Sequence, residues 1–305
     1  MESNFSPQIY GLIGYPVKHS FSPLMHNAAF KELGINAEYR LFEVKPAKLK
    51  DFLLTASKEL SGFNITIPHK VSTKLILETN FLQALKELSG EQAYHVRLSG
   101  AINTVKIDNG SIYCYNTDVS GFLTSLKEDL DFELTDKNVF LIGCGGAGRA
   151  VIAGLSWRDV KVRKVYVYDI QREAVESLKQ HFQTLPLEWQ NVLQEKIEFI
   201  TSEQIADKLK NCHLLVNASG LGMKDGDLSV VKKKLFHKNL FVYDLVYNKN
   251  TQLIREAKEC SLPACGGLGM LLHQGAKAFS IWTNKPAPIT IMKETLKKEM
   301  EKLCF

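Results

Sequence analysis

The sequence predicts an α/β protein of two domains, an N-terminal α/β domain and a second domain built on a doubly wound parallel sheet. Three observations point to this fold class. Strand-like segments alternate with helical ones in the first 70 residues, a glycine-rich turn at 143–148 joins a buried strand to a helix, and further strands alternate with helices after it. We expect one domain at residues 1–117, completed by C-terminal helices at 268–305, and another at residues 118–267.

The composition is that of an ordinary globular protein. Of 305 residues, 45% are hydrophobic and 23% are charged, and the net charge of +5 comes from 38 basic and 33 acidic residues scattered along the chain. We expect no nucleic-acid or membrane partner, because no basic tract dominates and no apolar run approaches the ~20 residues that span a bilayer. The six cysteines lack metal-site spacing and residues 1–5 carry no secretory signal, so we expect a soluble, cytoplasmic protein without a metal.

A candidate anion site follows the first strand. Residues 8–15 are mostly apolar, and Ser22 before Pro23 has the pattern of an N-cap and first helical residue, with Gly34 as the stop signal. Ser20 and Ser22 bring two hydroxyls to the start of this helix, where the dipole favours a carboxylate. The alternative is that Ser22 only caps the helix, and the local pattern leaves both interpretations open.

The segment 62–70 follows a second predicted strand and helix at 37–60. Residues 62–67 alternate between apolar side chains and the polar Asn64 and Thr66, which predicts a half-buried strand with an amide and a hydroxyl on one face. A proline then ends the strand, and Lys70 begins a helix. Polar groups at the carboxyl end of a strand are typical of a small-molecule site. Taken alone, the segment is explained as well by a solvent-facing strand and a surface lysine.

A hairpin is predicted around Asp108-Asn109-Gly110, whose Asn-Gly pair favours a tight turn. Asn103 lies early in the first strand of this hairpin and Asp118 lies just after the second, so we expect the hairpin to bring them near one another. Asp118 is also expected to cap a helix that runs to about residue 130. The polar stretch 78–98 before the hairpin is expected to be helical at first and then irregular, and residues 90–98 receive no role.

The glycine-rich turn has the full context of a dinucleotide-binding fingerprint of the Rossmann type. The sequence G-x-G-x-x-G follows a strand at 138–142 and opens a helix, and a second strand at 164–168 ends at Asp169. Gly143 permits the tight turn, Gly145 lets the backbone approach a diphosphate, and Gly148 lets the helix pack on the strand. An acidic residue at Asp169 predicts NAD, because a carboxylate binds both ribose hydroxyls and repels a 2′-phosphate. Two points weaken that preference: Arg172 is close in sequence, and a simple turn aspartate would give the same pattern.

Later segments continue the alternation. Strands are expected at 197–200, 213–217 and 240–244, and a glycine-rich segment at 266–270 precedes a helix that contains Gln274. The last helix carries an apolar stripe that we interpret as core packing against the first domain: Met292, Leu296, Met300 and Leu303.

Eight segments together resemble the shikimate/quinate dehydrogenase family. They follow one another in order along most of the chain: GYPVKHSFSPLMHN, GFNITIPHK, GAINT, YNTD, GCGGAGRA, VNASGLGM, DLVYN and GLGMLLHQGAKAF. The resemblance implies the reversible reduction of 3-dehydroshikimate to shikimate, a step of chorismate and aromatic amino-acid synthesis. Several of these segments are specific to this family and not shared by Rossmann proteins in general.

The resemblance also assigns roles to individual residues. Lys70 and Asp118 would be the catalytic pair, with the lysine as proton donor to the alkoxide and the aspartate holding a hydroxyl and the lysine. Ser20 and Ser22 would bind the substrate carboxylate. The remaining substrate contacts would come from Asn64, Thr66, Asn103, Tyr247 and Gln274. The cofactor would be lined by Gly143, Cys144, Gly145, Gly146, Ala147, Asp169, Leu245 and Gly267.

Two departures from the family pattern bear on the cofactor. Relatives that use NADP usually carry an Asn-Arg-Thr type motif where this chain has Asp169-Ile170-Gln171, and VNASGLGM replaces a commoner Asn-Ala-Thr form. NAD is therefore expected, while NADP is not excluded. Two other functions stay open: an NAD-dependent quinate/shikimate dehydrogenase, and a non-catalytic sensor of a shikimate-like ligand. The expected partners are small molecules, with quinate open as a second substrate, and the protein is expected to be a monomer or homodimer.

Overall fold

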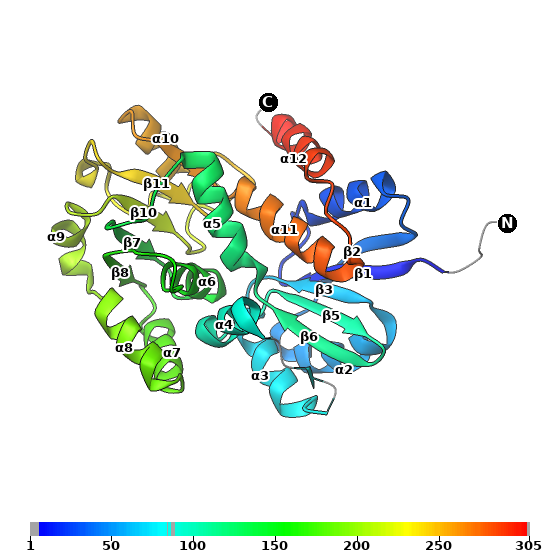
Figure 1. Ribbon diagram of the computed structural model, residues 1–305. Helices are drawn as coiled ribbons and strands as arrows, with labels where there is room; N and C mark the ends of the chain where they lie inside the picture. The colour runs from blue at the N-terminus through cyan, green and yellow to red at the C-terminus, as the bar shows by residue number, and fades with distance from the viewer. Residues whose placement is uncertain (1–5, 84, 87–88, 304–305) are drawn as a thin grey trace. The chain divides into compact units, whose positions relative to one another are not determined.

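The computed structural model describes residues 6–83, 85–86 and 89–303. The chain divides into two compact units, residues 1–117 with 272–305 and residues 118–271 (Figure 1). Three of the expectations involve parts of the chain that the structure does not describe. These are the absence of a signal segment at residues 1–5, the thiol of Cys304 and the side chain of Leu303 in the apolar stripe.

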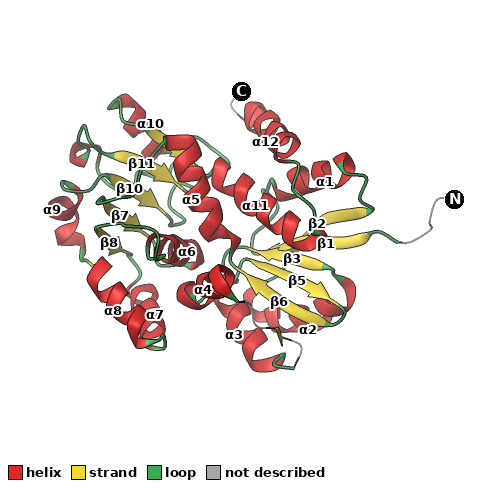
Figure 2. Cartoon of the chain, in the orientation of Figure 1, coloured by secondary structure: helices red, strands yellow, loops and turns green. Residues whose placement is uncertain are grey.

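The first unit contains a six-stranded sheet in the order β2-β1-β3-β5-β6-β4. Figure 2 labels five of these strands: β2, β1, β3, β5 and β6. β1 pairs in parallel with β2 and β3, β3 and β5 are antiparallel, and β5 and β6 form the predicted hairpin, in which Asn109 and Gly110 both have positive φ. The strands are β1 (Gln8–Gly14), β2 (Ala37–Glu43), β3 (Gly62–Ile65), β4 (Leu85–Lys86), β5 (Thr104–Asp108) and β6 (Ser111–Tyr115).

Helices cover both faces of this sheet. α2 (Leu49–Glu59) and α3 (Lys70–Asn80) bury one face in an aliphatic core that includes Ile13, Phe63 and Ile65. α1 (Ser22–Glu32) and α11 (Leu268–Thr283) supply aromatic side chains to the other face, where Trp282 donates from Nε1 to the carbonyl of Val105 at 2.9 Å. α12 (Ile289–Leu303) packs on α1 with Met292 and Leu296 buried, which confirms the expected core stripe at these two positions.

Three local expectations for this unit are corrected. β3 ends at Ile65 and not at residue 67, because Thr66–His69 forms a turn that leaves Ile67 52% exposed. The strand is fully buried and not half-buried, because helices cover both faces of the sheet. α1 begins at Ser22 with Phe21 in the capping position, so Ser22 is not the N-cap. The part of the polar stretch that was expected to be irregular is helical: α4 runs from Gly90 to Ser99, and the left-handed backbone of Gly100 caps it.

The second unit is a six-stranded parallel sheet in the order β12-β11-β10-β7-β8-β9. Numbered within the unit, this is the order 3-2-1-4-5-6 of dinucleotide-binding sheets, with the switch point between β7 and β10. Its strands are β7 (Asn138–Ile142), β8 (Lys164–Tyr168), β9 (Ile197–Phe199), β10 (Leu214–Asn217), β11 (Phe241–Asp244) and β12 (Ala264–Gly266). Its helices are α5 (Thr117–Leu130), α6 (Gly146–Leu155), α7 (Arg172–Gln183), α8 (Leu187–Lys196), α9 (Ile205–Leu209) and α10 (Gln252–Glu259).

Alternating strand residues bury both faces of this second sheet. Phe140 and Ile142 pack into a core with Leu253 and Ile254 of α10, while Tyr243 points to the opposite face and meets Phe122 of α5 edge-on. The expected fold class, with a doubly wound second sheet and C-terminal helices that return to the first unit, is confirmed. Within the described residues, no helix is both long and apolar enough to cross a membrane.

Candidate functional site

A buried cluster of amides and hydroxyls lies on the aromatic face of the first sheet, where β3 and β5 pair. Asn64 is 4% exposed; its Nδ2 donates to the carbonyl of Asn103 (3.2 Å) and to Oγ1 of Thr104 (2.9 Å), and its Oδ1 accepts from the hydroxyl of Tyr39 (2.8 Å). The side chain of Asn64 is therefore fixed from both ends. Its carbonyl oxygen still has a second lone pair with which to accept from a ligand.

The network continues from Asn103 to Gln274 of α11. The Oδ1 of Asn103 accepts the backbone N–H of Thr117 (2.7 Å), and its Nδ2 donates to Oγ1 of Thr117 (2.9 Å) and to Oε1 of Gln274 (3.4 Å). Asn64, Asn103 and Gln274, three predicted substrate contacts from distant parts of the sequence, are thus joined in one network. Tyr39 and Thr104 belong to the same network and were missed, because strand pairing and not local pattern brings them there.

The two predicted serines lie at the start of α1. Ser20 Oγ accepts the backbone N–H of Ser22 and is 3.2 Å from the hydroxyl of Ser22. Ser20 is half-buried and Ser22 is buried. Two adjacent hydroxyls beside the first amides of a helix form a set of donors that suits an anion.

Lys70 is the first residue of α3 and is half-buried. Its carbonyl accepts the N–H of Ile102, which ties the start of the helix to the segment before Asn103. A lysine in the first turn is unfavourable to the helix dipole, and no acidic residue occupies that turn of α3 to compensate. The position therefore needs a reason other than helix stability. Thr66, four residues earlier, is half-buried in the turn that follows β3.

Asp118 lies in the first turn of α5 and is 5% exposed. We expected Asp118 to cap this helix, but the helix already begins at Thr117, so Asp118 lies inside it. The residue before Asp118 is held by Asn103 through the hydrogen bonds described above. These bonds fix the backbone at Thr117, the first residue of α5.

The glycine-rich loop has the geometry that dinucleotide binding requires. Gly143 has φ +109°, and a Cβ there would lie 2.7 Å from the backbone of Ala218, which follows β10 across the switch point. A Cβ on Gly148 would lie 1.9 Å from the carbonyl oxygen of Gly143, so only glycine allows α6 to approach the loop. A Cβ on Gly145 would meet nothing within 4 Å, which leaves this backbone open to a ligand. The loop therefore fits a diphosphate on the first amides of α6.

The loops after β10 and β11 are held by a buried carboxyl group. Asp244 accepts from Nδ2 of Asn217 (2.9 Å), from the N–H of Val246 (3.1 Å) and from the hydroxyl of Thr251 (2.6 Å), and burial raises its pKa. Next to this network, a Cβ on Gly267 would lie 2.2 Å from the carbonyl oxygen of Leu245. Leu245 and Gly267, two predicted cofactor contacts, are therefore neighbours. Tyr247 is half-buried in the same loop after β11.

Asp169 follows β8, and both of its carboxylate oxygens accept backbone N–H groups. Oδ2 accepts from Cys144 in the glycine loop at 2.7 Å, and Oδ1 accepts from Gln171 at 2.9 Å. The carboxylate anchors the glycine loop to the end of β8. This structural role explains an acidic residue at the position without any cofactor preference.

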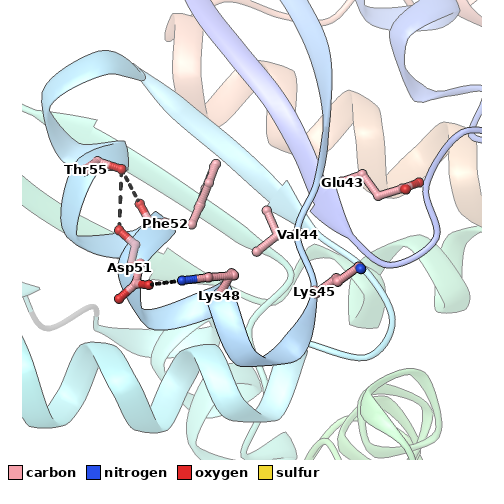
Figure 3. Close-up of a pocket in the computed structure, with 7 residues that line it drawn as sticks. All are labelled: Glu43, Val44, Lys45, Lys48, Asp51, Phe52 and Thr55. Atoms are coloured by element: carbon pink, nitrogen blue, oxygen red, sulfur yellow. Dashed lines mark hydrogen bonds and ion pairs between the residues drawn. The ribbon is translucent and has the colours of Figure 1, made fainter.

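None of the predicted site residues lines the surface pocket drawn in Figure 3. It has a volume of about 520 Å³ and lies in the first unit, where β2 leads into α2. Its charged side chains include Lys48 and Asp51, which pair with each other at 3.2 Å (Figure 3). The lining residues are Glu43, Val44, Lys45, Lys48, Asp51, Phe52 and Thr55.

Two family models match this chain. A shikimate dehydrogenase substrate binding domain matches residues 12–105, and a shikimate 5′-dehydrogenase C-terminal domain matches residues 267–297. Among curated proteins, the shikimate dehydrogenase (NADP(+)) of Methanopyrus kandleri is 36% identical over 94% of both chains. The enzyme of the same name from Aquifex aeolicus is 36% identical over 96% of this chain and 98% of its own.

These relatives correct the expected cofactor. The relatives from Methanopyrus kandleri, Methanobrevibacter smithii and Aquifex aeolicus are all named as NADP(+) enzymes, and one solved shikimate dehydrogenase with 33% identity is a complex with NADP⁺. The preference for NAD inferred from Asp169 is therefore wrong. Its physical reason fails because the carboxylate of Asp169 is directed at the backbone of two loops.

Solved structures agree with the sequence relationship. The shikimate dehydrogenase of Aquifex aeolicus has a TM-score of 0.79 at 34% identity and covers 96% of this chain and 99% of its own. The Thermus thermophilus enzyme, solved with NADP(H) and shikimate, has a TM-score of 0.77 at 30% identity, with coverage of 96% and 99%. With relatives of this identity along nearly its whole length, the chain belongs to the shikimate dehydrogenase family.

Proposed function

We propose that this protein is a shikimate dehydrogenase that reversibly reduces 3-dehydroshikimate to shikimate with NADPH. One observation carries the proposal: a chain related to shikimate dehydrogenases over 94% of its length contains both a buried amide network around Asn64 and Asn103 and an open glycine loop at the switch point of a parallel sheet. The first supplies fixed polar groups for a small polyhydroxy ring. The second supplies amides for a diphosphate.

Lys70 is the proposed acid–base residue. The bound dinucleotide supplies the hydride in the reduction and accepts it in the oxidation. As the ketone carbon gains the hydride, its oxygen becomes an alkoxide, and the ammonium of Lys70 stabilises that charge and gives up one proton to form the alcohol. In the reverse direction, neutral Lys70 removes the alcohol proton. Asp118 accepts a hydrogen bond from a substrate hydroxyl.

The substrate is held by groups of two kinds. Ser20 and Ser22 donate to its carboxylate, in keeping with their place at the first turn of α1. The ring hydroxyls and the carboxylate have further proposed contacts in Asn64, Thr66, Asn103, Tyr247 and Gln274. Because Asn64 and Asn103 already have internal partners, they are oriented before the substrate binds, and binding need not order them.

The cofactor is proposed to bind along the carboxyl edge of the second sheet. The backbone from Gly143 to Ala147 takes the diphosphate, and Leu245 and Gly267 contribute from the loops after β11 and β12. Asp169 holds the glycine loop by accepting a hydrogen bond from the backbone N–H of Cys144. Leu245 and Gly267 are neighbours in the structure, which is consistent with one shared contact surface.

A four-way assay tests this function: purified protein with shikimate or quinate as the alcohol, and NADP⁺ or NAD⁺ as the acceptor, followed at the absorbance of the reduced cofactor. We expect shikimate with NADP⁺ to give the highest kcat/KM. Shikimate binding without reduction of either cofactor would support a sensor and reject an enzyme. Higher kcat/KM with quinate than with shikimate would reject the proposed substrate.

A further inference from the structure

Arg149 is a buried cation in the second unit that has no acidic partner among the described residues. It lies in the first turns of α6 and is 4% exposed. Its Nε donates to the carbonyl of Cys144 at 3.4 Å and its Nη2 to the hydroxyl of Ser177 in α7 at 2.9 Å. Among the described residues, no carboxylate lies within ion-pair distance of its guanidinium. A guanidinium stays charged in proteins, so the apoprotein bears the cost of a buried cation with neutral acceptors only.

The position of Arg149 connects this charge with the glycine loop. The peptide groups of Cys144 are held from two sides, its N–H by the carboxylate of Asp169 and its carbonyl by Arg149. A carbonyl turned toward a bound diphosphate would repel it. Because Arg149 holds this carbonyl on the protein side, the next amides along the loop, which have no acceptor within the helix, are left for the ligand.

We propose that Arg149 is a positioning residue for the cofactor: it fixes the Cys144 carbonyl under the glycine loop, and its buried positive charge raises the affinity of that loop for the diphosphate of a dinucleotide. Charge interactions are screened less inside the protein than at its surface, so a buried cation acts on the ligand more strongly than an exposed one. The inference rests on the proposed function, because it requires the second unit to bind a dinucleotide.

The test compares three variants by isothermal titration calorimetry with the apoprotein. Arg149→Met removes the charge and keeps a straight side chain of similar length. Arg149→Lys keeps the charge and loses the planar fork. Arg158→Met is the matched control, because Arg158 follows the same helix, its side chain is 80% exposed, and the change in net charge is identical. Each variant is titrated with NADP⁺ and with 2′-AMP, which has the 2′-phosphate but no diphosphate.

We expect Arg149→Met to raise the Kd for NADP⁺ by about tenfold or more, the effect of one partly screened unit charge, and to change the Kd for 2′-AMP by less than about threefold. Arg149→Lys should keep most of the affinity, and Arg158→Met should bind as the wild type does. Thermal unfolding of the apoproteins separates binding from folding. Arg149→Met should melt no lower than wild type, because a buried cation without a counter-ion is removed.

Four results would overturn the inference. These are an unchanged Kd for NADP⁺ in folded Arg149→Met, equal losses for NADP⁺ and 2′-AMP, a Lys variant as weak as the Met variant, and wild-type protein that binds no dinucleotide. If Arg149→Met does not fold, the Lys variant decides alone, since a large loss of NADP⁺ affinity with the charge retained contradicts the proposal. Wild-type protein that binds NADP⁺ but does not oxidise shikimate would reject the proposed function and leave the role of Arg149 standing.

Discussion

Lys70 occupies a position that helix stability disfavours, which makes its substitution informative. We predict that Lys70→Ala lowers kcat by roughly 10²–10⁴-fold, the usual contribution of a positioned acid–base group, while the Kd for shikimate changes far less. Steady-state kinetics and equilibrium binding of shikimate measure the two effects separately. Normal turnover with only a raised KM would refute the catalytic role.

Lys74 provides the control for this substitution. It lies one turn further along α3, where its half-buried side chain pairs with the exposed Glu78. Lys74→Ala removes the same charge from the same helix. We expect its kcat to stay within about twofold of wild type, because Lys74 has no proposed role in proton transfer. A comparable loss in both variants would indicate a general effect on the helix.

The hydroxyl of Tyr39 has a role that can be isolated by removing one atom. Tyr39→Phe deletes the donor to Oδ1 of Asn64, which leaves a buried acceptor without this bond, at a cost of about 1–3 kcal/mol in the free energy of unfolding. Because Asn64 then has fewer restraints, we also expect a higher KM for shikimate and a smaller change in kcat. Chemical denaturation and kinetics check the two parts. Unchanged values in both would exclude the orienting role.

Sequence reasoning predicted candidate site residues whose signals are local and did not predict the residues that tertiary pairing adds to the amide network. Lys70, Asn64 and Asn103 stand in recognisable segments, whereas Tyr39 and Thr104 reach the network across strands, and no short-range pattern reports that contact. Asp169 shows a different limit. Its distance from the glycine loop was read correctly, but the direction of its carboxylate depends on backbone amides that a sequence does not display.

At the level of elements, two glycines of the glycine loop are predicted to serve different purposes: Gly148 allows close packing, and Gly145 leaves space for the ligand. Gly148→Ala should destabilise the apoprotein by about 1–3 kcal/mol, as overpacking does, because its Cβ would collide with the carbonyl of Gly143. Gly145→Ala should leave the stability close to wild type, since its Cβ meets no protein atom within 4 Å.

The two glycine variants should differ in NADP⁺ affinity in the opposite sense to their stability: the more stable variant, Gly145→Ala, should bind NADP⁺ more weakly. A methyl group at residue 145 would occupy the space into which the diphosphate is proposed to come, so we expect Gly145→Ala to weaken NADP⁺ binding while the protein stays folded. Thermal unfolding and titration calorimetry on both variants check this. If Gly145→Ala binds NADP⁺ as wild type does, the diphosphate does not approach the loop there.

Elements with strong periodicity or turn chemistry were predicted closely, and α4 was not. The hairpin, β7 and β8 were recognised from alternation, from an Asn-Gly turn and from a buried apolar run. α4 was missed because its buried residues include His95 and Ser99, so no apolar stripe marks its inner face. The strand that contains Asn64 was made too long because the alternation continues to Ile67, although the chain turns away after Ile65.

For the molecule as a whole, the path of the chain matters, because the first unit is completed by the last residues. Trp282 of α11 donates to Val105 of β5, and Phe279 packs against Phe30 of α1. The stability of the first unit thus depends on contacts between residues more than 170 positions apart (|i−j| = 177 for Trp282 and Val105). Such contacts form only after long loop closure, so we expect this unit to fold late relative to its local helices.

His26 connects these distant segments and makes stability depend on pH. Its ring stacks on Tyr39 with centroids 4.4 Å apart and lies 5.4 Å from Trp282, and neither ring nitrogen has a hydrogen-bond partner among the described residues. Burial lowers the pKa of His26 to about 3, against 6.5 for the free group. Between these values the unfolded chain binds a proton that the folded chain does not, so the free energy of unfolding falls as pH decreases, by about 1.4 kcal/mol per pH unit.

His26→Phe should remove this component of the pH dependence while it keeps an aromatic ring in the stack. We expect wild type to lose stability on going from pH 7.5 to pH 5 by about 2 kcal/mol more than the variant, the contribution of the single histidine over the part of that range below its free pKa. Urea denaturation at the two pH values measures the difference, and the other titrating groups cancel because both proteins share them. Parallel pH profiles would show that His26 is protonated in the fold or not buried, and that the aromatic stack between the first and last segments of the chain tolerates a charge.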